Sequence, residues 1–259
     1  MEENYRRYPI GIQNFEQLRN RNCVYVDKTE LVYRLANTDS VYFLSRPRRF
    51  GKSLLVSTLE AYFQGKKDLF KGLAMERLEK DWNVYPVFHI DFSLTKYTTL
   101  FDLQEQLNLF LLRCEKVYGA EKEEKTPAAR LQGMIRRAYE QTGLPVVVLI
   151  DEYDAPLLDS NSNIPLQQEL RNELRKFFSP LKGLGQYLRF LFITGISKFS
   201  QMSIFINIYQ WSSNDMAKKT VKPNFDCVIV NSDDNLNSDE LSYYTKIQVR
   251  VTKKLADIQ

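Results

Sequence analysis

Three groups of residues have side chains suited to phosphate chemistry. Gly51-Lys52-Ser53 has the form in which phosphate-binding loops end, with a lysine that reaches the β- and γ-phosphates and a hydroxyl that binds Mg²⁺. In Asp151-Glu152, the aspartate would hold Mg²⁺, usually through water, and the glutamate would orient or deprotonate the attacking water. Thr194 ends a later apolar run and is a candidate sensor of the γ-phosphate, with Lys198 a weaker one. A threonine that simply ends a strand fits Thr194 equally well.

The loop departs from the usual pattern at its start. The full motif is G-x-x-x-x-G-K-[ST], and its first glycine falls on Arg46. Pro47, whose φ is fixed by its ring, can form the turn by another route, and neighbouring arginines add positive charge beside an anion. We predict a phosphate loop with Lys52 facing solvent, and the alternative is a chance Gly-Lys-Ser in a basic turn. The predicted nucleotide-binding residues are Arg48, Arg49, Phe50, Gly51, Lys52, Ser53 and Leu54; the predicted metal residues are Ser53 and Asp151; the predicted catalytic residues are Lys52, Glu152 and Thr194.

The flanking sequence predicts the elements that would position this loop. Val41–Ser45 is an apolar, aromatic and β-branched run, typical of a buried strand. Residues 54–63 carry apolar side chains at helical spacing, and Gly65 then favours a stop. The loop would therefore lead from a strand into a helix N-terminus, whose partial positive charge favours phosphate.

The rest of the chain alternates between predicted strands and helices. Strands are expected at 86–93, 146–150 and 188–193, and helices near Leu100–Tyr118, Pro127–Thr142 and 166–181. Such alternation is typical of an open, mostly parallel α/β sheet that binds ligands at the carboxyl ends of its strands. We predict a three-layer P-loop NTPase fold, with 86–93 as an additional strand between the Walker A strand before the loop and the Walker B strand at 146–150. The charged run at 122–125 is expected to be solvated.

With these residues identified, the chain resembles a bacterial family of predicted AAA-like ATPases, most of them uncharacterised. The likeness covers roughly residues 8–205 and rests on YPIGIQNFEQLR (8–19), YVDKTELV (25–32), FLSRPRRFGKSLLVSTLEAYF (43–63), LIDEYDAPL (149–157) and FITGISKFSQMSIF (192–205). RPRRFGKS resembles that family's own form of the phosphate loop. The resemblance implies an ATPase domain that binds ATP and Mg²⁺, often followed by a restriction-endonuclease-like domain.

The likeness stops at Phe205, which divides the chain into a predicted ATPase domain at 1–205 and a divergent tail at 206–259. All ten glycines lie at or before Gly195, and the tail is polar, so we expect it to be loosely packed. Two runs in it, FDCVIVN and KIQVRV, are possible strands. Compared with the family it resembles, the chain looks truncated or joined to foreign sequence.

Composition narrows the function classes. A net charge of +4 and the lack of a recognisable module give little support to direct nucleic-acid binding, although the resembled family's nucleases leave a DNA-related role open. Three scattered cysteines, no apolar signal core and no 18-residue apolar run predict a cytoplasmic protein without membrane contact. The only histidine, His89, lies in a predicted strand, so a zinc site or a Ser-His-Asp triad has no support.

Two questions stay open at this stage. The chain is either a Mg²⁺-dependent ATPase or a non-catalytic nucleotide-binding or interaction module, and its protein partner is unknown. A GTPase is disfavoured because no N-K-x-D base-reading motif is present. The residues before the first strand include candidate adenine contacts, although packing is the favoured interpretation for each one: Ile10, Gly11, Phe15 and Tyr25.

Overall fold

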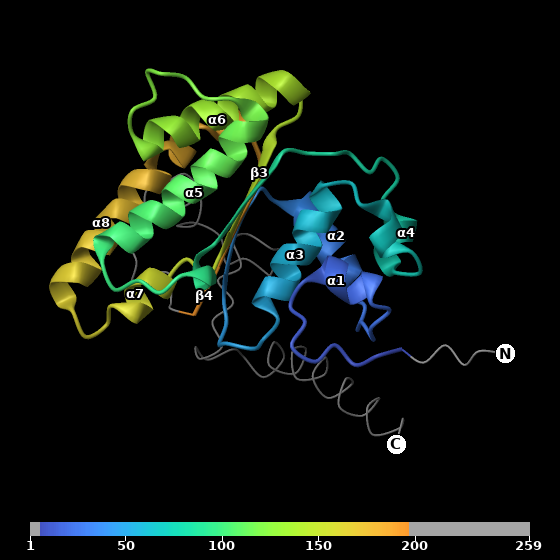
Figure 1. The fold of residues 1–259 in the computed structure, drawn as a ribbon. Helices are drawn as coiled ribbons and strands as arrows, with labels where there is room; N and C mark the ends of the chain where they lie inside the picture. The colour runs from blue at the N-terminus through green and yellow to red at the C-terminus, as the bar shows by residue number, and fades with distance from the viewer. Residues whose placement is uncertain (1–5, 197–259) are drawn as a thin grey trace, which may run out of the picture.

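The computed structural model describes residues 6–196, in which a four-stranded sheet lies between two layers of helices (Figure 1). The strands are β1 (Val41–Ser45), β2 (Val87–Asp91), β3 (Val146–Asp151) and β4 (Leu188–Gly195). The helices are α1 (Phe15–Asn20), α2 (Thr29–Thr38), α3 (Lys52–Phe63), α4 (Ala74–Leu78), α5 (Leu100–Tyr118), α6 (Pro127–Thr142), α7 (Ala155–Asp159) and α8 (Ile164–Phe178), with short 3-10 turns at Lys67–Phe70, Phe92–Leu94, Ser179–Gly183 and Gly185–Tyr187.

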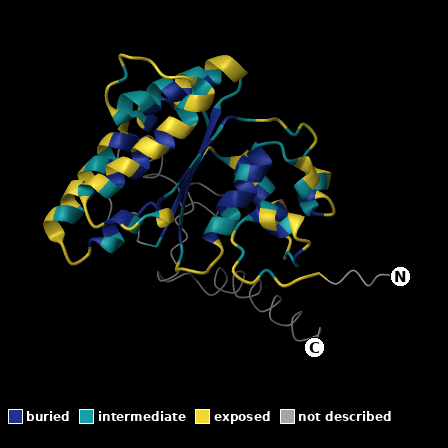
Figure 2. Cartoon of the chain, in the orientation of Figure 1, coloured by how far each residue is buried: buried dark blue, intermediate teal, exposed yellow. Residues whose placement is uncertain are grey.

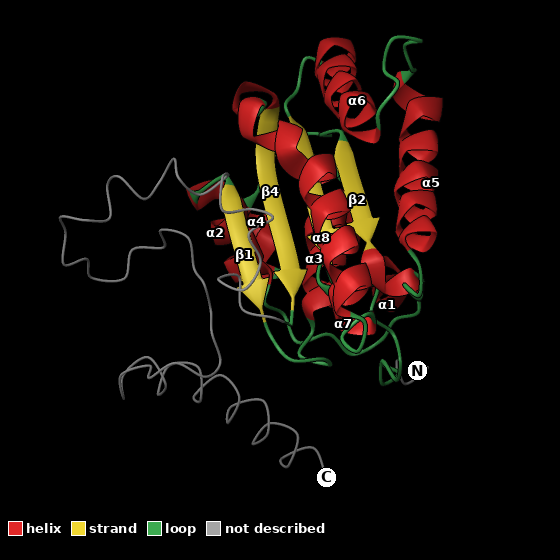
Figure 3. Ribbon diagram, turned by 90° about the vertical axis from the view of Figure 1, so that its left-hand side faces the viewer, coloured by secondary structure: helices red, strands yellow, loops and turns green. Residues whose placement is uncertain are grey.

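All four strands are parallel, in the order β1-β4-β3-β2. Their carboxyl ends therefore lie at one edge of the sheet, to which the arrows in Figure 3 point. The segment predicted as a strand at 86–93 forms β2, which lies between β1 and β3 in the sequence but at the edge of the sheet in space. The strand that lies between β1 and β3 in space is β4. This order brings the ends of β3 and β4 next to the loop that follows β1.

Both faces of the sheet are buried, as the colours in Figure 2 show for the strands. In β3 all six residues are buried, and alternate side chains enter two separate cores. Val146, Val148 and Ile150 pack with residues of α5, α6 and α8, whereas Val147 and Leu149 pack with residues of α1 to α4. This two-sided burial explains why β3 reads as an unbroken apolar run and not as an alternating one.

The bounds of α5 and α6 agree with those predicted, because both helices have strong local start signals. Thr99 and Asp102 form a capping box at α5, and Thr126 caps α6 just before Pro127. The short helices α1, α2, α4 and α7 were not predicted. The tail at 206–259, with both of its possible strands, lies outside the described residues. None of the helices that the structure describes is long and apolar enough to cross a membrane.

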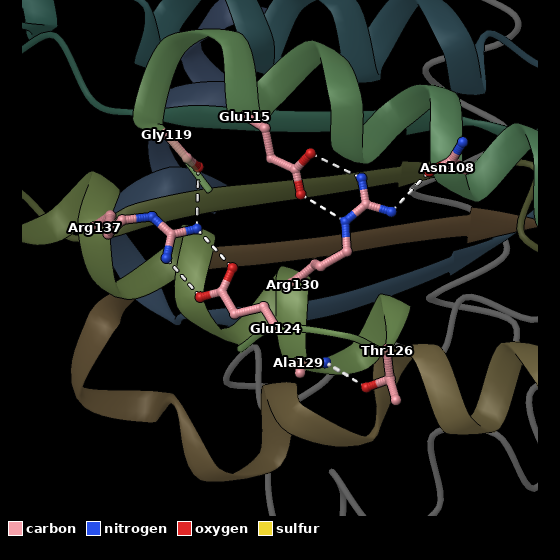
Figure 4. A network of polar contacts seen from close by, with 8 residues as sticks. All are labelled: Asn108, Glu115, Gly119, Glu124, Thr126, Ala129, Arg130 and Arg137. Carbon is pink, nitrogen blue, oxygen red and sulfur yellow. Dashed lines mark hydrogen bonds and ion pairs between the residues drawn. The ribbon is translucent and has the colours of Figure 1, made fainter. Parts of the chain in front are cut away.

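Two arginine–glutamate pairs join α5, α6 and the connection between them (Figure 4). Arg130 of α6 makes two bonds to Glu115 of α5, at 2.6 and 2.8 Å. Arg137 makes two bonds to Glu124 in the connection, at 2.5 and 2.9 Å. The prediction that residues 122–125 are solvated is therefore wrong for Glu124, whose side chain is only 10% exposed. Bidentate pairs of this kind fix the positions of α5, α6 and the connection relative to one another.

Candidate functional site

The loop between β1 and α3 runs along the carboxyl edge of the sheet. Gly51 precedes α3 with a φ of 77°, in the left-handed region that glycine adopts without strain, and its carbonyl accepts the first helical hydrogen bond from Leu55. Arg49 also has a positive φ, of 68°, whereas Arg46 does not. The position that lacks the usual glycine therefore needs no left-handed backbone. The N–H groups of the first turn of α3 have no acceptor within the helix and remain available to a ligand.

Lys52, the first residue of α3, is buried, and the prediction that it faces solvent is wrong. Its Nζ donates to the carbonyl oxygens of Arg46 and Pro47, at 3.0 and 3.2 Å. The third partner of the ammonium is Oε1 of Glu152, at 3.0 Å. The side chain of Lys52 is 2% exposed and that of Glu152 is 15% exposed. The ammonium of Lys52 therefore lies under the loop with three acceptors, and the carboxylate of Glu152, which follows β3, neutralises its charge.

Thr194 links the ends of β3 and β4. Its hydroxyl donates to Oδ1 of the buried Asp151 and accepts from the backbone N–H of Glu152, at 3.2 Å. Its carbonyl accepts from the N–H of Tyr153, at 3.0 Å. Both functions of this hydroxyl are used inside the protein, so the geometry gives Thr194 a clear part in holding the two acids. A role as γ-phosphate sensor stays a prediction.

Glu152 has a φ of 51°, which is unusual for a residue other than glycine. Burial raises the pKa of Glu152, and the charges of Asp151 and Asp154 add to that rise, while the hydrogen bond and charge of Lys52 oppose it. Backbone strain of this kind costs about 1–3 kcal/mol and persists where surrounding contacts enforce it. Here the contacts from Thr194 enforce it, and they aim the carboxylate at Lys52.

Two residues that the sequence did not single out complete the arrangement. The buried Asp154 accepts from the N–H of Ile196, at 2.9 Å, and Ser45 Oγ donates to the carbonyl of the same residue, at 3.0 Å. A Cβ on Gly195 would collide with the ring of Tyr153 and the carboxylate of Asp154, so glycine is required there for close approach. The spacing of Asp154 three residues after Asp151 was the available signal, but a repeated acid after a strand has no unique meaning.

The structure thus brings together four of the predicted site residues, namely Lys52, Asp151, Glu152 and Thr194. Ser53 and Leu54 follow in the first turn of α3 and are half-buried. The other predicted loop residues, Arg48, Arg49, Phe50 and Gly51, lie exposed at the surface. Lys198 lies outside the described residues.

Of the possible adenine contacts, two are core residues. Phe15 is fully buried and packs against Tyr25 at 5.2 Å between ring centres, and burial raises the pKa of Tyr25 to about 12. Ile10, in contrast, is 90% exposed and precedes Gly11. The segment that carries them is tied to α3, because the N–H of Phe15 donates to Ser57 Oγ at 2.9 Å. Phe15 and Tyr25 thus pack in the core, Tyr25 at its half-buried margin, whereas Ile10 and Gly11 are exposed. Contact of any of them with adenine stays a prediction.

His89 on β2 is a partner of α3 and not a catalytic base in this structure. Its Nδ1 lies 3.0 Å from Oε2 of Glu60. Burial would lower the pKa of His89, but the bond and charge of Glu60, with the charges of Asp151 and Asp91, outweigh it and raise the pKa. For Glu60, burial works towards a higher pKa, but His89 and Lys66 outweigh it and lower the pKa.

Because His89 is the only histidine, its ring protons should give one NMR titration curve. We expect a pKa above the ordinary 6.5, and a lower pKa in Glu60→Gln, where burial acts without the opposing charge. The raised pKa of His89 contributes stability at low pH, and this contribution is lost as the pH rises through the pKa of the folded state. The lowered pKa of Glu60 contributes stability at higher pH, and this contribution is lost as the pH falls through the pKa of the folded state. The melting temperatures of the two proteins should therefore differ most between about pH 4.5 and 6.5. Identical titration curves would contradict this account.

Comparison with known proteins identifies the family of the chain. Residues 9–205 match the family model described as "Predicted AAA-ATPase". A protein from Azotobacter chroococcum mcd 1, "Uncharacterized protein in vnfD 5'region", is 38% identical over 202 residues, which cover 77% of this chain and 39% of that protein. The chain thus spans about two fifths of the length of this relative. No solved structure matches. The chain belongs to the predicted AAA-ATPase family.

Proposed function

We propose that the chain binds ATP with Mg²⁺ and hydrolyses it to ADP and phosphate. One observation carries the proposal: a buried lysine at the N-terminus of α3 is held between its own loop and Glu152, the acid that follows β3. Burying an ammonium is costly even when it is paired with an acid, so such a pair is weak evidence for a purely stabilising role. The lysine lies at a helix N-terminus, where the first N–H groups have no acceptor within the helix and favour phosphate.

Phosphate binding would proceed by exchange of partners. Lys52 already has three acceptors, so a phosphate oxygen must replace one of them. Glu152 is the partner most readily replaced, because it follows β3 and does not belong to the loop itself, and because burial raises its pKa. The exposed Arg48 and Arg49 add positive charge on the solvent side of the loop.

The acids and hydroxyls at this edge fit a magnesium ion held mainly through nucleotide and water. Within residues 6–196, no three His, Cys, Asp or Glu side chains lie together where they could hold a metal ion by themselves. Mg²⁺ commonly uses one or two protein ligands together with substrate phosphates and waters. Ser53 and Asp151 would provide them, and Thr194 uses only one carboxylate oxygen of Asp151. When bound, the ion would neutralise the charge of the β- and γ-phosphates.

Glu152 is then the residue that prepares water. Once a phosphate replaces it at Lys52, its carboxylate is released next to the γ-phosphate position, while Thr194 still holds its backbone. A carboxylate so placed can orient a water molecule and accept its proton. Ile10 and Gly11, tied to α3 through the following helix, are our candidates for contact with the base.

A second candidate function is a nucleotide-binding module without turnover. It is favoured by the ion pair between Glu152 and Lys52, which occupies the residue proposed to act as the base. Both candidates require that Lys52 binds phosphate, and they differ only in hydrolysis.

Calorimetric titration of the full chain with ATP and with GTP, each with Mg²⁺, tests the proposal, and phosphate release is measured on the same samples. We expect saturable ATP binding, weaker GTP binding and slow but measurable release of phosphate. Binding without release would favour the module, and absence of binding to either nucleotide would contradict both candidates.

A further inference from the structure

We propose that Asp91, at the end of β2, is a second carboxylate of the metal site, which holds a water of the hydrated Mg²⁺ beside Asp151. The inference rests on the proposed function and deepens it. It stands on three features of the structure: the register of β2 and β3, the face on which both side chains lie, and the contacts that fix Asp91.

The register places the two aspartates side by side. Asp91 is the Cα partner of Asp151 in the parallel pairing of β2 and β3. Neighbouring strands lie roughly 4.8 Å apart, and side chains at paired positions project in the same direction. The two carboxylates are therefore neighbours at the carboxyl edge of the sheet.

The shared face is the one covered by α3. Phe88 and Ile90 pack into the core on the side of α5 and α6, so the alternate residues of β2 face the other way. His89 confirms this direction, since its ring bonds to Glu60 on α3. Asp91 lies two residues after His89 on the same strand, so both side chains are on the face of the sheet that α3 covers. Because Lys52 and Ser53 begin that helix, Asp91 shares the layer in which the triphosphate would lie.

Asp91 is held in place by contacts that leave acceptor capacity on its side chain. The buried Gln106 donates to the backbone carbonyl of Asp91 at 3.1 Å and accepts from Thr95 at 3.2 Å. Oδ1 of Asp91 accepts from the N–H of Ser93 at 2.8 Å and so caps the turn at Phe92–Leu94. A carboxylate can accept about four hydrogen bonds, so this cap occupies only part of it.

A carboxylate in this position suits water better than direct metal contact. Mg²⁺ keeps several of its waters in proteins, and outer-shell acceptors for such ligands typically change metal affinity by about 10- to 100-fold. The competing interpretation gives Asp91 only the cap of the turn. A third interpretation gives it only a negative charge, which would repel the triphosphate whether or not metal is present.

Asp91→Asn separates the three interpretations, because asparagine caps as well as aspartate but carries no charge. ATP affinity is measured by calorimetry in Mg²⁺ and in EDTA, with a melting curve for each protein. Asp68→Asn is the matched control, since it also removes one negative charge, and the side chain of Asp68 is 89% exposed and pairs with Lys71. If Asp91→Asn does not fold, Asp91→Ser is used in its place, because serine can also cap the turn at Phe92–Leu94.

We expect Mg²⁺ to raise the ATP affinity of the wild type and of Asp68→Asn by the same factor. In Asp91→Asn this factor should be about 10- to 100-fold smaller. In EDTA, Asp91→Asn should bind ATP as well as the wild type or better, with the same melting temperature. The inference would be overturned if Mg²⁺ tightened ATP binding of Asp91→Asn as much as that of the wild type. It would also be overturned if Asp91→Asn bound ATP more tightly than the wild type by the same factor in Mg²⁺ and in EDTA. Either result would leave the proposed function intact. If the wild type binds no ATP in either buffer, the proposed function fails, and this inference fails with it.

Discussion

Lys52→Ala is expected to abolish measurable ATP binding. The ammonium is buried, and in the complex it would donate to phosphate from a site that excludes most water. Truncating one partner of such a charge pair costs about 2–5 kcal/mol, which corresponds to about a 30- to 4,000-fold loss of affinity. Calorimetry on the folded variant measures this directly, and the loss should appear with and without Mg²⁺.

The control for this variant follows from the ion pair. Removing Lys52 alone leaves the carboxylate of Glu152 without its partner, which should lower stability by about 1–3 kcal/mol. The double variant Lys52→Ala/Glu152→Gln removes both charges and should regain much of that stability without regaining ATP binding. Melting curves separate the two effects. If the double variant is stable and binds ATP like the wild type, the lysine is a structural residue and the proposed function is wrong.

Sequence reasoning succeeded where local chemistry decides the structure. The start of α6 is set by Thr126 and Pro127, and its end by Gly143 in the left-handed region, so its bounds could be predicted from neighbouring residues alone. β3 was predictable because a strand buried on both faces needs apolar side chains at every position. The short helix α1 does have a cap, Asn14, but its six residues are too few to show a helical period, and Phe15 and Leu18 are buried in the core.

The site was only partly predictable because its contacts depend on strand order. The residue types at Lys52, Asp151 and Glu152 suggested phosphate chemistry, and the structure gathers them at one edge. The bond between Thr194 and Asp151 requires β4 to lie next to β3, which no local pattern specifies. The burial of Lys52 follows from its pairing with Glu152 across two elements, which are far apart in the sequence.

Asp91 illustrates the same limit from the other direction. It stood inside a run that the sequence already predicted as a strand, yet a strand prediction alone does not say which neighbour it pairs with. Only the register with β3 places it beside Asp151, and only the contact between His89 and Glu60 shows which face it shares. A candidate site residue on an edge strand is therefore harder to recognise than one in a loop with a recognisable motif.

Glu152→Gln should retain ATP binding and lose hydrolysis. The amide keeps the shape of the side chain but cannot accept the proton of the attacking water, and loss of a general base typically costs about 10²- to 10⁴-fold in rate. The structure adds an expectation for affinity. With the charge of Glu152 removed, Lys52 loses its strongest internal partner, so the variant should bind ATP at least as tightly as the wild type.

Two measurements on the same preparation decide the role of this acid. Calorimetry gives the affinity for ATP with Mg²⁺, and phosphate release under single-turnover conditions gives the rate of the chemical step. Thr194→Val is the informative companion, because it keeps the shape at the end of β4 but removes the hydroxyl that bonds to Asp151 and to the backbone of Glu152. It should also slow hydrolysis, since both acids lose their common anchor. Equal turnover in Glu152→Gln and the wild type would assign Glu152 to neutralising the buried lysine, and the base would have to be sought elsewhere.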